Sequence, residues 1–350
     1  MALELDNIHY SYREIDGYNK SFVFVMSPRE PGKTTNMWVA KIYRGWIKDF
    51  KPWIYVVRQS VEITEAMIET IFAEIQKFTD AELSPSYTKG AFKEGIVDVK
   101  LNGKMFIRIV SLSISLRRIK LAKLVNIKGV FMDEYIIDPK TKERYITNEA
   151  FKIKEAYSTW RREADGILKW YFAGNPYSLY NPLFVDWGVE VNKLKKGDFY
   201  VGGNYVIQWA TLNPLLREKL LRDNPLYEFD EDYAGYALEG QAINDANIPI
   251  GTTPVNYKLS IVFKMGKKYL GIFKSNEDYN APFYAEEISS PSKSRDIYCF
   301  EFEDLVERGI ILSFDERRKL QRFKDAMRTF NVIFEDINIY YMIIEIYNYL

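Results

Sequence analysis

The segment that most constrains the fold lies near the N-terminus, where an apolar run leads through a short loop into a helical pattern. Residues 22–26 alternate aromatic and aliphatic side chains, and Gly32-Lys33-Thr34 ends the loop that follows. Strand, loop and helix in this order form the context in which a Gly-Lys-Thr sequence builds a phosphate-binding loop, or Walker A motif. We therefore expect an α/β fold with this loop at the carboxyl end of a strand.

The residue types in the loop suit nucleotide binding. Backbone amides at the helix N-terminus would face the phosphates, Lys33 would reach the β- and γ-oxygens, and the Thr34 hydroxyl could bind Mg²⁺. Ser27 stands where the motif has its first glycine, and Pro28 and Pro31 lack amide donors, so an ordinary loop before a helix is the alternative. The residues expected to bind the nucleotide are Ser27, Arg29, Gly32, Lys33, Thr34, Thr35 and Arg58.

A second motif reduces the weight of that alternative. The apolar run 129–132 ends in the adjacent acids Asp133 and Glu134, as a Walker B strand does. Asp133 would hold Mg²⁺ directly or through water, and Glu134 would orient and polarise the attacking water. If the pair is considered alone, the alternative is that both acids are solvated loop residues after a core strand.

The first half of the chain alternates short apolar runs with stretches of helical periodicity, the pattern of a parallel sheet covered by helices. The expected strands are 22–26, 53–57, 105–112, 129–132, 170–173 and 205–209, and the expected helices are 34–48, 62–78 and 148–162. A glutamate after Walker B together with additional strands indicates the additional-strand, catalytic-glutamate branch of P-loop NTPases.

Two further residues follow expected strands. Asn175, after the strand 170–173, could sense the γ-phosphate or hold the water, or it could be a turn residue of Gly-Asn-Pro. Arg58, after the strand 53–57, could order the nucleotide or the catalytic glutamate, or it could be a surface arginine.

Arg161 and Arg162 close the helix expected at 148–162, where motor ATPases often present an arginine finger to the nucleotide of a neighbouring subunit. Helix C-termini also favour cations through the helix dipole alone, and the sequence does not choose between the two arginines.

A basic cluster precedes the Walker B run and contains no acid before Asp133. In a ring, a loop here would point into the central channel and grip DNA phosphates without reading bases. A solvated helix or loop face is the alternative. The expected DNA-binding residues are Arg117, Arg118, Lys120 and Lys123.

The remaining chain predicts a second domain. We expect a P-loop ATPase domain at 1–212, an irregular connecting region with Asn-Pro pairs at 213–256, and an α+β domain at 257–350. Lys plus Arg and Asp plus Glu both total 48, so any DNA contact must come from a local patch. A single cysteine and a single histidine exclude a Cys/His zinc site, and no apolar run is long enough for a membrane span.

Taken together, these segments resemble the small genome-packaging ATPases of phi29-like short-tailed phages. The resemblance extends over nearly the whole chain and rests on 27–34, 53–58, 130–134, 160–162, 173–175, 181–184, 259–273 and 317–320. It implies ATP and Mg²⁺ as cofactors, double-stranded DNA as substrate, and a homomeric, pentameric ring on the portal of an empty capsid. It also implies action in the host cytoplasm, transiently at the procapsid portal vertex and not in the mature virion. Some relatives use a structural packaging RNA, and this sequence does not decide that point.

The resemblance further implies an RNase H-like C-terminal domain related to the nuclease of larger terminases. Such a nuclease needs carboxylates on its first strand, but 258–263 carries none, and Glu277 and Asp278 fall in an expected loop. We expect a vestigial nuclease with DNA and portal contacts as its task. The competing functions are a DNA-independent, kinase-like enzyme and a nucleotide-stabilised assembly protein that does not hydrolyse ATP.

Overall fold

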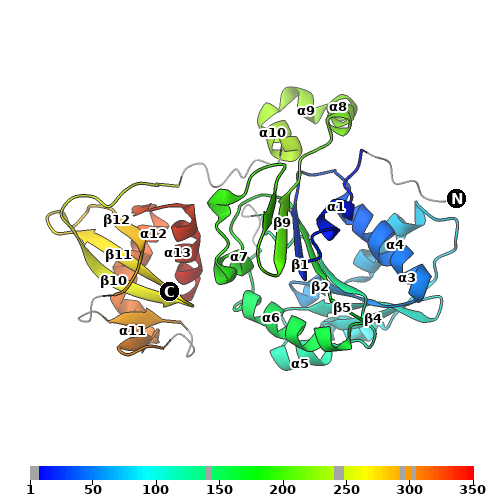
Figure 1. Ribbon diagram of the computed structural model, residues 1–350, viewed down its shortest axis with the longest axis horizontal. Coiled ribbons are helices and arrows are strands. Elements are labelled where there is room, and N and C mark those ends of the chain that lie inside the picture. The colour runs from blue at the N-terminus through cyan, green and yellow to red at the C-terminus, as the bar shows by residue number, and fades with distance from the viewer. Residues whose placement is uncertain (1–7, 139–142, 240–247, 292–295, 301–304) are drawn as a thin grey trace. The chain divides into compact units, whose positions relative to one another are not determined.

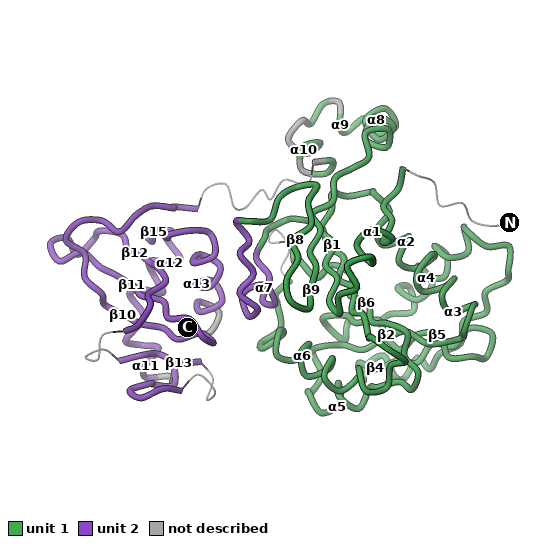
Figure 2. The backbone as a smooth tube through the Cα atoms, in the orientation of Figure 1, with its two compact units in different colours: residues 1–179, 193–243 green, residues 180–192, 244–350 purple. Residues whose placement is uncertain are grey.

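The computed structural model describes residues 8–138, 143–239, 248–291, 296–300 and 305–350 (Figure 1). The chain forms two compact units (Figure 2). Unit 1 contains residues 1–179 and 193–243, and unit 2 contains residues 180–192 and 244–350. Among the described residues, no helix is long and apolar enough to cross a membrane.

A nine-stranded sheet forms the centre of unit 1, in the order β3-β4-β5-β2-β6-β7-β1-β9-β8. The six strands from β5 to β9 in this order run parallel, and antiparallel strands flank them at both edges. The strands are β1 (Phe22–Met26), β2 (Trp53–Val57), β3 (Pro85–Ser86), β4 (Ile96–Leu101), β5 (Lys104–Ser111), β6 (Gly129–Met132), β7 (Trp170–Gly174), β8 (Phe199–Val201) and β9 (Tyr205–Trp209).

Helices cover both faces of this sheet, because successive side chains of a strand point to opposite faces. In β7, the Tyr171 ring lies 5.4 Å from the ammonium of Lys41, whereas the neighbouring Trp170 stacks on Trp160 of α6. The helices of unit 1 are α1 (Arg13–Asp16), α2 (Lys33–Asn36), a π-helical segment (Met37–Tyr43), α3 (Arg44–Asp49), α4 (Glu65–Gln76), α5 (Leu116–Leu121), α6 (Glu149–Trp160), α8 (Pro214–Asp223), α9 (Leu226–Phe229) and α10 (Glu231–Glu239).

The structure corrects the expectation of an irregular connection at 213–256. Three helices, α8 to α10, occupy residues 214–239 and belong to unit 1. The Asn-Pro pairs begin helices instead of interrupting structure: the side chain of Asn213 accepts a hydrogen bond from the Leu215 amide, and Pro214 occupies the first turn. Proline suits this position because its missing N–H would have no partner within the helix.

Unit 2 contains a six-stranded mixed sheet in the order β14-β13-β10-β11-β12-β15. Strands β10 to β12 are antiparallel, and β13 and β14 extend the sheet in parallel from β10, in agreement with the expected α+β domain. Its elements are α7 (Pro182–Trp187), β10 (Tyr257–Met265), β11 (Lys268–Ser275), β12 (Phe283–Ile288), β13 (Ile297–Cys299), β14 (Gly309–Ile311), α11 (Phe314–Lys319), α12 (Gln321–Arg328), β15 (Val332–Phe334) and α13 (Ile337–Tyr349).

The segment 180–192 belongs to unit 2, although we expected it in the ATPase domain. Its α7 packs on α13, and two side-chain contacts fix it there. The Tyr180 hydroxyl donates to the Glu345 carboxylate, and the Val191 amide donates to Asn338. These partners lie more than a hundred residues apart in the chain, which local sequence patterns do not reveal.

Candidate active site

The loop after β1 accommodates Ser27 where a glycine was expected. The Ser27 amide donates to the Gly174 carbonyl at 3.2 Å, so the pairing of β1 with β7 continues through this residue. Its buried hydroxyl donates to the Pro28 carbonyl at 3.0 Å. The left-handed backbone conformations fall later, at Glu30 (φ 67°) and Gly32 (φ 83°). Ser27 therefore needs no conformational freedom of the kind that glycine supplies.

Lys33 lies in a chain of polar contacts that runs back to the loop. Its ammonium donates to Oδ1 of Asn175 at 2.7 Å. Nδ2 of Asn175 donates to the Tyr177 hydroxyl at 3.1 Å, and Nη2 of Arg29 donates to the same hydroxyl at 3.0 Å. Lys33 and Tyr177 are both 7% exposed. The structure thus brings together three residues that the sequence selected and one, Tyr177, that it did not.

The two acids after β6 lie beside Lys33, because β6, β7 and β1 are neighbours and their carboxyl ends meet at one edge of the sheet. Burial raises the pKa of Asp133, while the Lys33 charge and a hydrogen bond from Thr34 oppose this rise. Burial lowers the pKa of Lys33, and the charges of Asp133 and Glu134 oppose this change. Desolvation and then the Asp133 charge raise the pKa of Glu134. The charges of Lys33, Asp133 and Glu134 therefore influence one another at this edge of the sheet.

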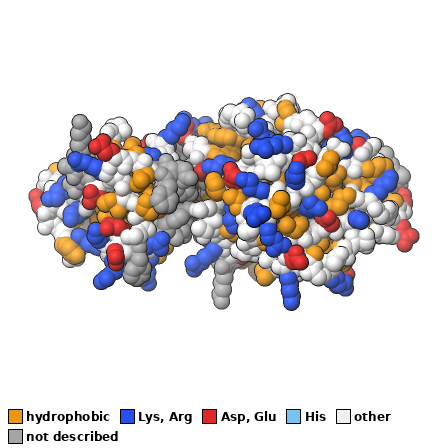
Figure 3. All heavy atoms as spheres, turned by 90° about the horizontal axis from the view of Figure 1, so that it is seen from below, with side chains coloured by type: hydrophobic (Ala, Val, Ile, Leu, Met, Phe, Trp, Pro, Cys, Tyr) orange, Lys and Arg blue, Asp and Glu red, His pale blue; other side chains and the backbone are white. Residues whose placement is uncertain are grey.

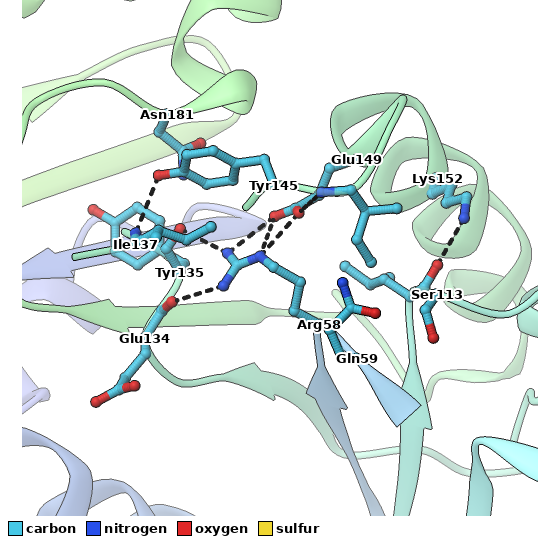
Figure 4. A network of polar contacts seen from close by, with 12 residues as sticks. Arg58, Gln59, Ser113, Glu134, Tyr135, Ile137, Tyr145, Glu149, Lys152 and Asn181 are labelled. Atoms are coloured by element: carbon cyan, nitrogen blue, oxygen red, sulfur yellow. Dashed lines mark hydrogen bonds and ion pairs between the residues drawn. The ribbon is translucent and has the colours of Figure 1, made fainter. Parts of the chain in front are cut away.

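Arg58 is buried and contacts the backbone of the Walker B loop (Figure 4). Its Nη1 donates to the Glu134 carbonyl at 3.2 Å, and its Nη2 donates to the Tyr135 carbonyl at 3.0 Å. Nε donates to the buried Glu149 carboxylate at 3.0 Å, and the Tyr145 ring lies 5.0 Å from the guanidinium. Among the described contacts, Arg58 thus supports the loop of the catalytic-glutamate candidate. The sequence did not reveal the role of Glu149, because an acid in the first turn of a helix is common.

Three expected site residues lie away from the Lys33 contacts. The Thr35 hydroxyl donates to the Glu74 carboxylate of α4 at 2.6 Å, away from the Lys33 chain of contacts. Arg161 and Arg162 are exposed in a 3₁₀ turn after α6. Within the described part of the chain, neither arginine contacts Lys33 or the acids after β6.

The prediction of a loop for the basic cluster is wrong, because most of the cluster is helical. Leu116–Leu121 forms the helix α5, and three of the four expected DNA-binding side chains pair with glutamates that are distant in sequence. The pairs are Arg118–Glu94 at 3.2 Å, Lys120–Glu155 at 2.5 Å and Lys123–Glu163 at 2.5 Å. Neighbouring elements supply these acids, which is why the local sequence concealed them.

The surface around α5 nevertheless carries many cations. Figure 3 shows the side of unit 1 on which α5 lies, with Lys and Arg side chains interspersed among hydrophobic ones. Arg117 is exposed, and Leu121 and Val125 are 67% and 70% exposed. Ion pairs between such exposed side chains contribute only about 0–1 kcal/mol of stability.

The sheet order, the loop after β1 and the acids after β6 define a P-loop ATPase of the additional-strand, catalytic-glutamate class. The family model of the Podovirus DNA encapsidation protein (Gp16) matches residues 5–349. The chain therefore belongs to this family, the DNA-packaging motor ATPases of phi29-like phages.

Two solved structures share the fold over nearly the whole chain. The phi28 gp11 DNA packaging motor superposes with a TM-score of 0.67 at 17% identity, covering 97% of this chain and 98% of the other. A chain of the bacteriophage phi29 genome packaging motor assembly gives a TM-score of 0.66 at 22% identity, covering 98% of each chain. No curated protein sequence matches the chain.

Proposed function

We propose that this motor ATPase hydrolyses Mg-ATP with Lys33 on the β- and γ-phosphates, Thr34 and Asp133 on Mg²⁺, and Glu134 as the base for water. The observation that carries the proposal is the convergence of these residues, which come from two strand ends of one sheet edge. A hydroxyl and a carboxylate are oxygen ligands of the kind Mg²⁺ prefers, and the burial that raises the pKa of Asp133 would be compensated by a cation.

Bound Mg²⁺ would neutralise charge on the phosphates during in-line displacement. The hydrogen bonding of Thr34 that opposes the rise in the pKa of Asp133 supports a shared role of the two side chains at the metal. Among the described residues no cluster of three or more acidic, His or Cys side chains could hold a metal, so the protein offers a partial ligand set. Mg²⁺ commonly completes such a set with substrate phosphates and water.

Glu134 suits the role of base because its carboxylate is accessible while its backbone is held in place. Arg58 binds the carbonyls of residues 134 and 135, and the Glu134 amide donates to Asp133 at 3.0 Å. Arg58 thereby orders the glutamate, and Asn175 stands across the site beside Lys33.

The exposed arginines after α6 fit a role in a neighbouring subunit. Arg161 or Arg162 would reach the nucleotide of the next chain in a ring, where such a finger raises the rate about 10³- to 10⁵-fold. We propose a pentameric ring docked on the portal of a procapsid in the host cytoplasm, with the cations of α5 against double-stranded DNA. A structural RNA on the portal would be a further partner of such a ring.

Unit 2 would serve as a contact domain without nuclease activity. A two-metal nuclease needs carboxylates on its central strand, and β10 (Tyr257–Met265) carries none. Glu277 and Asp278 lie after β11, where their backbone amides donate to the Ser275 hydroxyl and the Glu277 carboxylate accepts from the Asn256 side chain.

The deciding experiment is steady-state ATP hydrolysis by Glu134→Gln with and without long double-stranded DNA. We expect hydrolysis to fall about 10²- to 10⁴-fold, the usual contribution of a general base, while ATP binding survives. Lys33→Ala should lose both ATP binding and hydrolysis. The control Glu69→Gln, which changes an exposed glutamate of α4, should retain both.

The competing functions give different results. A kinase-like enzyme would turn over ATP without stimulation by DNA, and a nucleotide-stabilised assembly protein would bind ATP without hydrolysing it in the wild-type chain. Unchanged turnover in Glu134→Gln would mean that another group activates the water.

A further inference from the structure

The side-chain amide of Asn175 has an orientation that its neighbours dictate. The Lys33 ammonium has three donors and no acceptor, so the amide oxygen of Asn175 must face it, at 2.7 Å. The amide nitrogen consequently faces the Tyr177 hydroxyl at 3.1 Å. The oxygen therefore faces the lysine of the phosphate-binding loop, and the nitrogen is engaged by Tyr177.

Tyr177 is built into a position where it can maintain this orientation. Its amide donates to the Asn175 carbonyl at 2.9 Å, which closes a three-residue turn around Pro176. Proline restricts φ to a value suited to the centre of such a turn. The turn folds the buried Tyr177 back beside Asn175, and the hydroxyl also accepts a hydrogen bond from Arg29 of the phosphate-binding loop.

We propose that Tyr177 is a positioning residue that fixes the Asn175 amide with its oxygen toward the phosphates and ties it to Arg29. The proposal rests on the proposed function, because it assigns Asn175 to the hydrolytic site. An amide held this way presents an acceptor to the site. It can hold the Lys33 ammonium or a hydrogen of the attacking water, whereas binding a phosphate oxygen would require the amide N–H groups.

This assignment separates two roles that were open for Asn175. With Tyr177 accepting from its nitrogen, Asn175 holds the lysine or the water and does not bind the γ-phosphate through N–H. When Lys33 turns to the phosphates, as the proposed function requires, the Tyr177 hydroxyl alone would hold this orientation, and without it the amide could rotate by half a turn. Tyr177→Phe removes the acceptor that Asn175 and Arg29 share and retains the buried ring.

The test is a double-mutant cycle with Tyr177→Phe, Asn175→Ala and the combination, measuring kcat for ATP hydrolysis with DNA and the Kd for ATP. We expect Tyr177→Phe to lower kcat about 10- to 100-fold, as loss of an outer hydrogen-bond partner typically does. The Kd should change less than about threefold, since Lys33 and the loop amides remain. In the Asn175→Ala background, Tyr177→Phe should cost almost nothing further, because it acts through the amide.

A matched control is Tyr43→Phe, which removes another buried tyrosine hydroxyl, one that contacts Thr79 at 3.3 Å. It should leave kcat unchanged. The positioning role would be overturned if Tyr177→Phe lowered kcat equally in the wild-type and Asn175→Ala backgrounds. It would also be overturned if the Kd for ATP rose by the same factor as kcat fell.

The outcomes distinguish this inference from the proposed function. If Asn175→Ala lowers kcat and Tyr177→Phe does not, the positioning role is wrong and the site assignment stands. If Lys33→Ala and Asn175→Ala both leave hydrolysis unchanged, the proposed function fails and the inference fails with it.

Discussion

The backbone of Glu134 adopts the left-handed conformation, with φ 50°. For a residue other than glycine this costs on the order of 1 kcal/mol, and such strain persists only where surrounding contacts impose it. Arg58 supplies those contacts through the two carbonyls of residues 134 and 135. The Glu149 carboxylate compensates the buried charge of Arg58, so the geometry of the catalytic-glutamate candidate depends on a residue of α6.

Glu149→Gln tests this dependence. The change leaves Arg58 with a buried and uncompensated charge, which typically destabilises a protein by about 3–5 kcal/mol. We expect the urea-unfolding midpoint of unit 1 to fall and hydrolysis to fall with it. The remaining amide oxygen can still accept one hydrogen bond, so the effect should lie toward the lower end of this range.

The matched control for that variant lies on the same helix. Glu155→Gln removes an ion pair with Lys120 whose side chains are 33% and 41% exposed, and such surface pairs contribute about 0–1 kcal/mol. Similar losses of stability in the two variants would contradict a special role for the buried pair.

Among the elements, those with strong local patterns were predicted from the sequence and those that depend on distant partners were not. All six expected strands of the sheet and its three expected helices are confirmed within a few residues. The antiparallel strands β3, β4 and β8 were not predicted because they join the sheet through pairing with neighbouring strands and carry weak or interrupted apolar runs. The motifs around Lys33 and Glu134 are local, whereas Arg58 meets Glu149 across 91 positions.

Helix α5 provides a prediction at the scale of one element. Replacing Arg117 and Arg118 by alanine should weaken binding of double-stranded DNA uniformly across sequences. It should also reduce the slope of log K against log salt by about 1 for each lost phosphate contact. Filter binding over a range of salt concentrations measures both effects.

The corresponding control changes a cation elsewhere in unit 1. Lys77→Ala at the end of α4 removes a side chain that is 65% exposed and should leave affinity and slope unchanged. Wild-type binding by the Arg117/Arg118 variant would show that α5 does not grip DNA and that its cations serve only the glutamates beside them.

At the scale of the whole molecule, the proposed site combines Lys33 for the phosphates, Asp133 for the metal and Glu134 as the base, and among the described contacts neither Arg161 nor Arg162 reaches these residues. Arg161 and Arg162 follow the last turn of α6, whose first turn carries Glu149. The helix that supports the loop of the catalytic-glutamate candidate thus leads directly into the arginines proposed to reach a neighbouring nucleotide. In a ring, hydrolysis in one subunit would therefore depend on the next.

Mixing two inactive variants tests this dependence. Subunits with Arg161→Ala and Arg162→Ala keep a complete site but lack the finger, and Glu134→Gln subunits keep the finger but lack the base. Each alone should show little DNA-stimulated hydrolysis. When they co-assemble at random in equal amounts, roughly one interface in four pairs an intact site with an intact finger, and activity should recover in proportion.

Mixing the arginine variant with subunits that carry all three changes should restore nothing. Full activity of the arginine variant alone, or no recovery in rings shown to be mixed, would mean that these arginines do not act between subunits.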